Sequence, residues 1–291
     1  MKKLSVALIA LAFVFASCSK SSTDSAAPNN NNNNNNNPET FPTTKQALFL
    51  YFTGSECNPC GSIGIPNYNT IITNLNYKDK VVPVSVHCNA PAPDAMYVTS
   101  TGGDLLQLII VNNSYSAPTY LVPPNAQKSG VDGDAVSKIQ SYINTISSQP
   151  PTAVANVSAT YAASTGIWSV KTRTKFLADD SADFRVAVWI TEDGVSWHQV
   201  ANGAVVNPFI HDQVLRGAFS STFGDDIKVG PVKNGDIIEK TILGQKPGTQ
   251  TVPNVWNINN LSAVVVLFKY VANATPNTII LNAYKIKLPI Q

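Results

Sequence analysis

From residue 45 onward, apolar residues fall into runs with the length and spacing of strands and helices. Gln46 to Thr53 (QALFLYFT) and Lys80 to His87 (KVVPVSVH) are dense in apolar and β-branched residues, which predicts two buried strands. A Pro-led apolar run from Ser116 to Val122 predicts a third. Apolar positions spaced as on helices occur in 68–75, 104–112 and 134–147. Residues 45–149 therefore predict an α/β domain.

After Pro150-Pro151 the pattern changes to alternating apolar and polar residues, which is typical of strands with one buried face. Six runs show it: 153–161, 166–174, 184–191, 236–242, 262–271 and 279–288. Turn-forming Gly, Pro, Asn and Asp residues separate them. Residues 150–291 therefore predict an all-β antiparallel sandwich of the immunoglobulin-like type, joined to the first domain at the two prolines.

The N-terminus carries an export signal. Basic residues at 2 and 3 precede an apolar run of thirteen, Leu4 to Ala16, which is too short to span a bilayer of about 30 Å as a helix. The run ends in Phe15-Ala16-Ser17-Cys18, which resembles the lipobox of bacterial lipoproteins. We expect residues 1–17 to be removed as a signal peptide and Cys18 to be lipidated, so that the protein is anchored to a membrane. An ordinary secreted protein cut elsewhere is the alternative.

Residues 18–44 predict a disordered tether behind that anchor. They contain nine consecutive Asn and almost no large apolar side chains, so ordering them has little burial to offset its entropy.

Composition narrows the function classes. Charged residues are 13% of the chain, and 20 basic against 18 acidic residues give a net charge of +2. Loss of Lys2 and Lys3 with the signal peptide leaves 18 of each. A nearly neutral protein is a poor candidate for nucleic-acid binding, so we expect no nucleic-acid partner, and its membrane attachment must come from lipid.

The first domain carries a dithiol motif, Cys57-Asn58-Pro59-Cys60, between the first strand and a predicted helix. Strand, CxxC, helix, strand, helix, Pro-led strand and helix is the order of a thioredoxin-like domain. A zinc site needs a second pair of ligands at similar spacing, which the sequence lacks, so we expect neither metal nor cofactor. A helix N-terminus stabilises a thiolate, which makes Cys57 the candidate nucleophile and Cys60 the resolving thiol. In this fold Pro118 would lie opposite them with a cis peptide bond.

A family resemblance rests on several short segments. They are Tyr51-Phe52-Thr53-Gly54, Val82 to His87, Ala117-Pro118 and Phe209-Ile210-His211-Asp212-Gln213-Val214-Leu215-Arg216. Together they resemble the outer-membrane-protein-28-related family over about residues 45–291. The resemblance implies an outer-membrane lipoprotein with a thioredoxin-like domain followed by a β-rich domain.

Two departures from a working thioredoxin leave the role of the dithiol open. The buried acid of such oxidoreductases, six positions before the first Cys, falls at Tyr51, and Glu56 replaces the tryptophan next to Cys57. A negative charge there opposes thiolate formation. Two hypotheses follow: a binding or envelope-structure lipoprotein with a fixed disulfide, or a membrane-anchored thiol-disulfide oxidoreductase acting on envelope proteins.

The remaining candidates are weaker. His87 and Cys88 end the second strand near the expected dithiol, either as an imidazole that tunes Cys57 and a third redox thiol, or as a satisfied His and a small buried Cys. His211-Asp212 suggests an acid-base pair or packing of a loop. Two acidic clusters, Asp179, Asp180 and Asp183, and Asp225-Asp226, suggest calcium binding or solvated loops.

Overall fold

The computed structural model describes residues 40–124, 126–248, 250–272 and 278–290. The predicted signal peptide, the lipidation site Cys18 and the tether as far as residue 39 lie outside these residues. Thr40–Gln291 form one compact unit. In the described part of the chain, no helix is long and apolar enough to cross a bilayer.

The protein is mostly β, with few helices. In the first half, a π-helical turn, Cys60–Gly64, leads into α1, and a short α2 and a longer α3 follow. The helices of this half are α1 (Ile65–Thr73), α2 (Thr101–Leu106) and α3 (Ala135–Ser147), and its strands are β1 (Ala47–Thr53), β2 (Val81–His87), β3 (Thr119–Val122) and β4 (Ala126–Ser129). The second half holds β5 (Ala153–Ala162), β6 (Ile167–Phe176), β7 (Asp183–Glu192), β8 (Val195–Ala201), β9 (Ala204–His211), β10 (Val214–Ala218), β11 (Asp225–Lys228), β12 (Ile237–Gly244), a 3-10 turn (Ile258–Asn260), β13 (Leu261–Tyr270) and β14 (Thr278–Lys287).

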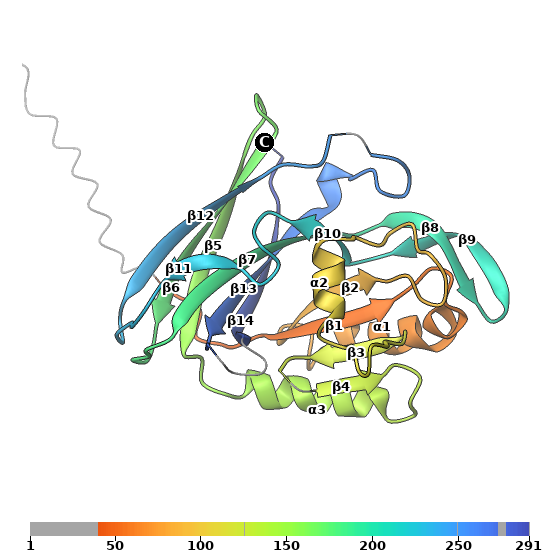
Figure 1. The fold of residues 1–291 in the computed structure, drawn as a ribbon, viewed down its shortest axis with the longest axis horizontal. Helices are drawn as coiled ribbons and strands as arrows, with labels where there is room; N and C mark the ends of the chain where they lie inside the picture. Colours follow the sequence, from red (N-terminus) through yellow and green to blue (C-terminus); the bar gives the residue numbers. More distant parts are fainter. Residues whose placement is uncertain (1–39, 125, 249, 273–277, 291) are drawn as a thin grey trace, which may run out of the picture. The chain divides into compact units, whose positions relative to one another are not determined.

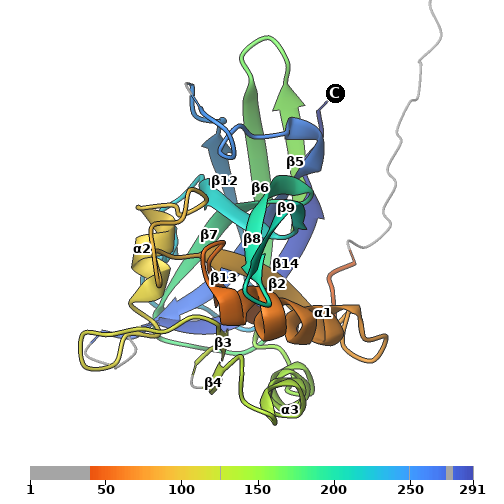
Figure 2. The ribbon, with the colours of Figure 1, turned by 90° about the vertical axis from the view of Figure 1, so that its right-hand side faces the viewer.

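Within the described residues the strands form three sheets (Figures 1 and 2). The largest is mixed, in the order β14-β13-β7-β10-β2-β1-β3-β4, with β11 pairing on β7. In it β1 is parallel to β2 and antiparallel to β3. An antiparallel sheet has the order β12-β6-β5, and β8 pairs with β9 as a separate hairpin.

The period of two along β1 places its side chains on opposite faces of the large sheet. Ala47, Phe49 and Tyr51 pack with α1 and α3. Leu48, Leu50 and Phe52 pack on the other face, in a core that includes Leu105 and Leu106 of α2. Figure 2 shows α3 and α2 on different sides of these strands.

The same alternation continues in β7 and β13. Val188 and Val265 point into a core shared with the β12-β6-β5 sheet, whereas Trp189 and Val264 belong to the core on the α2 side. The face covered by α1 and α3 near β1 is therefore covered by a second sheet near β13. Burial on both faces explains why β1, β7 and β13 are almost continuously apolar.

The large sheet crosses the expected domain boundary at Pro150-Pro151. Val214 of β10 pairs in parallel with Ser85 of β2, and the Ser85 N–H donates to Gln213 O at 2.8 Å. The predicted boundary between 45–149 and 150–291 falls between α3 and β5. That the two parts are separate domains stays a prediction. In the folded chain the two parts share one sheet and one core.

The six strands expected after residue 150 are all present, but they do not form a self-contained antiparallel sandwich. Three of them, β7, β13 and β14, belong to the mixed sheet, and three, β5, β6 and β12, pack over it. The sequence pattern gives each strand its two-faced character but not its partner, because partners are set by contacts far apart in the chain.

Candidate functional site

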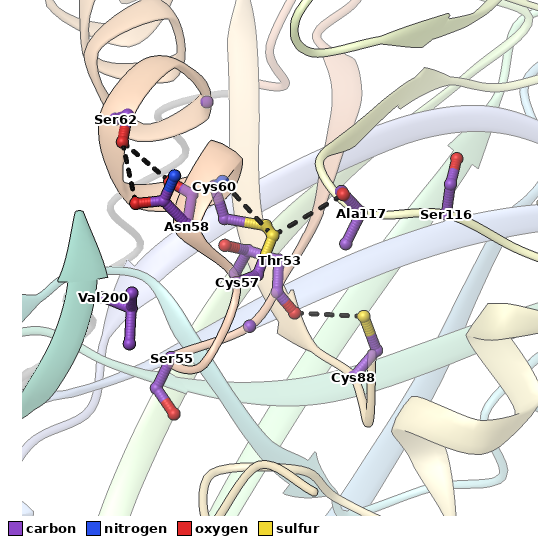
Figure 3. Close-up of a disulfide and its surroundings, with 12 residues drawn as sticks. Thr53, Ser55, Cys57, Asn58, Cys60, Ser62, Cys88, Ser116, Ala117 and Val200 are labelled. Atoms are coloured by element: carbon purple, nitrogen blue, oxygen red, sulfur yellow. Dashed lines mark hydrogen bonds between the residues drawn. A yellow bond between two sulfur atoms is a disulfide. The ribbon is translucent and has the colours of Figure 1, made fainter. Parts of the chain in front are cut away.

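The dithiol lies where β1 ends and helical structure begins (Figure 3). Cys57 directly precedes helical residues, and Cys57 and Cys60 are joined in a disulfide. The Cys60 N–H donates to Cys57 Sγ at 3.2 Å. Cys57 is 1% exposed and Cys60 0%, so the disulfide is enclosed by protein.

Pro118 lies beside this motif, as the sequence predicted. The Ala117–Pro118 bond is cis, and the Ala117 carbonyl oxygen is 3.5 Å from Cys57 Sγ. A Cβ placed on Gly64 would come within 2.8 Å of Pro118 Cβ. The close fit of Pro118 against the helical segment fixes the distance between the proline loop and the disulfide.

The β8–β9 hairpin covers the disulfide from the other side, where Figure 3 places Val200. Gln199 is fully buried, and its Nε2 lies 3.1, 3.2 and 3.3 Å from the carbonyl oxygens of Gly54, Ser55 and Cys57, which share the two N–H groups of the amide. The Val200 N–H donates to Ser55 O at 2.8 Å.

Two further contacts hold the tip of the hairpin. The N–H groups of Asn202 and Gly203 donate to Ser62 Oγ and Asn58 Oδ1 at 2.7 and 2.8 Å. Neutral hydrogen bonds of this kind contribute roughly 0.5–1.5 kcal/mol each, so together they hold the hairpin firmly.

Glu56 has a partner on the same hairpin. Its Oε1 forms a hydrogen-bonded pair with His198 Nε2. The sequence suggested that Glu56 opposes thiolate formation at Cys57, but in the fold its charge is directed to an imidazole. Glu56 therefore adds a further attachment between the motif and its cover.

Gly61 shows how closely the hairpin approaches. A Cβ built on it would lie 2.3 Å from Val200 O and 2.9 Å from Ala201 Cβ. Only a residue without a side chain lets the backbone of β8 come this close to the helical segment.

The sequence analysis did not predict the β8–β9 hairpin, although its turn has a recognisable sequence pattern. Asn202-Gly203 separates β8 and β9, and both residues have positive φ, 52° and 76°. Asn-Gly between two strand-like runs is the strongest short hairpin pattern. The flanking strands contain apolar residues such as Trp197 and Ile210, but these do not alternate regularly with polar ones and a proline interrupts β9, so a search for alternation did not find them.

Tyr51 occupies the position of the expected buried acid, and its hydroxyl forms two hydrogen bonds within the site. Its hydroxyl donates to Cys60 O at 3.3 Å and accepts from Thr53 Oγ1 at 3.0 Å. Burial raises the pKa of Tyr51 well above its ordinary value. The phenol therefore stays protonated and does not replace a carboxylate as proton acceptor.

A buried acid is instead supplied by Asp94, which the sequence did not single out. Its Oδ2 lies 2.8 Å from His87 Nδ1 and accepts the Ser55 N–H at 2.6 Å, while Oδ1 accepts the Met96 N–H at 2.8 Å. Burial acts to raise the pKa of Asp94, but His87 and the two N–H groups lower it to about 2. Asp94 thus holds the CxxC loop from inside the protein, through Ser55.

His211 completes this cluster. Its ring lies 5.2 Å from that of His87, and its Nε2–H donates to His198 O at 3.3 Å. Burial, followed by the charge of His87, lowers the pKa of His211 to about 3. His211 and Asp212 do not act as a pair, because Asp212 Oδ1 accepts the N–H of Gly194 instead.

His211 and its neighbours also line a cavity of about 50 Å³ with Tyr51, Thr53 and His87. A cavity needs about 10–15 Å³ to hold one water, so a cavity of about 50 Å³ has room for a few waters.

Cys88 has the geometry of a small buried residue. It is 0% exposed, and its thiol donates to Thr53 O at 3.0 Å. Burial first, and then the charge of Asp94, raise the pKa of Cys88 to about 12. A protonated thiol is a poor nucleophile.

The acidic clusters of the second half are used in contacts within the chain. Asp180 pairs with Lys269 and Asp226 with Arg185, while Asp179 pairs with Lys233. Among the residues that the structure describes, no group of three His, Cys, Asp or Glu side chains is placed to hold a metal ion.

The fold and site define a mostly β protein with a covered CxxC disulfide, and comparison with known families gives its relationship. The family described as "Outer membrane protein Omp28" matches residues 116–282, more than half of the chain. The chain therefore belongs to the Omp28 family of outer-membrane proteins. This confirms the resemblance drawn from the sequence, although the matched region does not include Cys57 and Cys60. No curated protein matches the sequence.

Solved structures add a likeness of fold. HBP35 of Porphyromonas gingivalis is 15% identical, with a TM-score of 0.63 over 86% of this chain and 77% of that one. A domain of the outer membrane lipoprotein Omp28 from Porphyromonas gingivalis is 16% identical and covers 47% of this chain and 88% of that one, with a TM-score of 0.26. The first likeness shows a shared fold, and the second is too low to carry an argument.

The approach of β8 to Gly61 gives a test of the cover. In Gly61→Ala the new Cβ meets backbone, so the hairpin must shift, at the ~1–3 kcal/mol typical of overpacking, and the disulfide should be reduced by dithiothreitol about tenfold faster. Gly133→Ala is the matched control, because its Cβ meets nothing within 4 Å. Reduction followed by thiol labelling measures both. Equal rates in wild type and Gly61→Ala, with the fold intact, would show that the hairpin is not the barrier.

His211 predicts a pH dependence of stability. Unfolded histidine takes up a proton near pH 6.5, whereas folded His211 does so near pH 3, so between these values the unfolded state binds more protons and stability falls as the pH falls. Between pH 6 and 4, wild type should lose about 1.4 kcal/mol per pH unit more than His211→Gln. Both proteins keep His87 and Asp94, which face the ring. Urea unfolding at several pH values measures the difference, and parallel curves would contradict it.

Proposed function

We propose that this protein is an outer-membrane lipoprotein, anchored through Cys18, that uses a thioredoxin-like scaffold for binding or for envelope structure. In this function the Cys57–Cys60 disulfide is a fixed brace rather than a reagent. The Omp28 family match supports the location, and the dithiol's surroundings support the role.

The observation that carries the proposal is the cover on the disulfide. A protein substrate must bring its own sulfur to Cys57 Sγ, but Cys57 is 1% exposed and lies between the proline loop and β8. The loop that holds Cys57 is bonded on one side to Gln199 and Val200 and on the other to Asp94. Reduction would have to disturb a segment that is bonded on both sides, which stabilises the oxidised form.

The thioredoxin-like part of the proposal rests on topology. The strands β2-β1-β3-β4 are neighbours in that order, with β1 and β2 parallel and β3 and β4 antiparallel to their neighbours. The CxxC motif follows β1, and a cis proline precedes β3.

One observation favours a second function, thiol-disulfide exchange. Cys57 Sγ lies 3.5 Å from the carbonyl of Ala117, beside Pro118. In that function the reduced Cys57 thiolate attacks a substrate disulfide and releases one substrate thiolate. Cys60 then attacks Cys57 Sγ, which releases the second substrate thiol and restores the Cys57–Cys60 bond. A separate dithiol donor must reduce the protein again for each turnover.

The reduction potential separates the two functions. A structural disulfide should have a potential below about −300 mV in equilibrium with a dithiol redox buffer, whereas exchange catalysts lie between about −270 and −120 mV. We expect the lower value and no catalysis of insulin reduction. A potential in the catalyst range together with insulin turnover would establish the oxidoreductase instead. Thioredoxin in the same assay controls for the reductant.

The anchor has its own test. Cys18→Ser removes the thiol that would be acylated, so the variant should incorporate no labelled palmitate and should leave the membrane fraction, because no second lipid signal would hold it. Cys88→Ser is the matched control and should behave as wild type in both assays. Continued labelling of the Cys18→Ser protein would place the lipid at another residue and contradict the proposed anchor.

A further inference from the structure

The large sheet curves back on itself on the side that α2 covers. Four strands separate β1 from β14 in the sheet order, yet the Gln46 N–H, just before β1, donates to Asn282 Oδ1 of β14 at 2.9 Å. Side chains from β1, β2, β3, β7, β10, β13 and β14 therefore share one core on the concave side, together with Leu105 and Leu106 of α2. With only 6 residues, α2 leaves part of this core uncovered.

An apolar cavity lies there, beside the end of α2. It measures about 240 Å³, and ten of its twelve lining residues are apolar. Leu105 and Trp189 form its floor, since each is at most 1% exposed. Leu108, Phe223 and Ile280 are partly exposed and form the walls that a ligand can reach. The cavity therefore opens to solvent but has the apolar lining that is usual in small-molecule sites.

The polar groups of the cavity exclude a charged ligand from its interior. The Trp189 Nε1–H in the floor already donates to Thr222 O at 2.8 Å. Gln107 is exposed and Thr278 partly exposed, so these two polar residues lie at the mouth. Among the described residues that line the cavity, none is charged. A charged group inside would lose its water without gaining a partner, so the enclosed part of a ligand must be apolar.

The volume limits the size of that apolar part. An apolar cavity of about 150 Å³ binds benzene, so a cavity of about 240 Å³ has room for about ten carbon atoms. This is enough for the end of an acyl chain and too little for a whole lipid. The chain belongs to a family of outer-membrane proteins, and in a membrane the acyl chains of lipids are the commonest apolar groups.

We propose that this cavity binds the end of an acyl chain. The methylene groups lie against Leu108, Phe223 and Ile280, and the polar end of the ligand stays in solvent beyond Gln107 and Thr278. A free fatty acid and a membrane lipid both supply this chemistry. The site goes beyond the function proposed above, because it depends neither on the state of the disulfide nor on the anchor at the N-terminus.

The test uses the full-length protein in digitonin, a detergent whose steroid is too large for the cavity. Decanol with a photoactivatable diazirine near its methyl end is added below saturation, the sample is irradiated, and the adducts are mapped by mass spectrometry. They should concentrate in the peptides that contain Leu108, Phe223 and Ile280. Leu108→Trp fills the cavity and should lower labelling of the other two peptides about tenfold, which corresponds to the loss of roughly two buried methylene groups.

Leu75→Trp is the matched control, because Leu75 is 77% exposed and does not line the cavity. It should leave the labelling unchanged. Ile280→Phe fills the cavity from another wall and should also lower the labelling, and circular dichroism checks the fold of each variant. Adducts spread evenly over the surface overturn the proposal, and so does labelling of the cavity that neither filling variant lowers.

Competition identifies the source of the chain. Unlabelled decanoic acid and didecanoylphosphatidylcholine are added in separate samples. Displacement of the probe by decanoic acid alone assigns a free fatty acid, and displacement by the phospholipid assigns a membrane lipid. Displacement by neither contradicts the proposal. A phenyl diazirine is used in parallel, and if it labels the cavity while the decanol probe does not, the cavity takes aromatic molecules and the acyl assignment is wrong. Because these variants leave both cysteines in place, the result is independent of the redox measurements.

Discussion

The parallel contact between β10 and β2 determines how the rest of the molecule is assembled. Val214 pairs with Ser85, and the backbone and side chain of Ser85 bond to the carbonyls of Gln213 and Asp212. Because β10 is fixed beside β2, the hairpin before it must lie over the carboxyl ends of β1 and β2, where the dithiol is. The segment after β10 must run past α2. One strand pair thus positions the cover of the dithiol.

The sequence predicted the parts of the dithiol site that are local. Cys57 and Cys60 are three residues apart at a strand-to-helix junction, which is enough to place them, and the cis bond before Pro118 follows from the fold that this order indicates. The shape of the loop around Cys57 was not predictable in this way. It depends on Gln199, more than 140 residues away, which has no distinguishing pattern because it acts through backbone carbonyls that every sequence has.

The two departures from a thioredoxin acquire a common explanation in the structure. Tyr51 carries a hydroxyl that bonds to Cys60 O, and Glu56 carries a carboxylate that bonds to His198. Both side chains hold the motif in place instead of activating a sulfur. The buried acid of this region is Asp94, which lies seven residues after His87 and accepts a backbone N–H. A comparison of positions in β1 shows that the usual acid is missing there, but it does not reveal that Asp94 takes its place.

Attachment of one short loop from two sides has a consequence for chemistry at the disulfide. Ser55 donates its N–H to Asp94 inside the protein and accepts from Val200 outside it. A movement of Ser55 toward the hairpin lengthens its bond to Asp94, and a movement away from the hairpin breaks its bond to Val200. A buried polar group left without a hydrogen-bond partner costs about 1–3 kcal/mol, so opening the loop in either direction is unfavourable. Access to Cys57 therefore requires the whole β8–β9 hairpin to move, and the reactivity of the disulfide is a property of that hairpin as much as of the two cysteines.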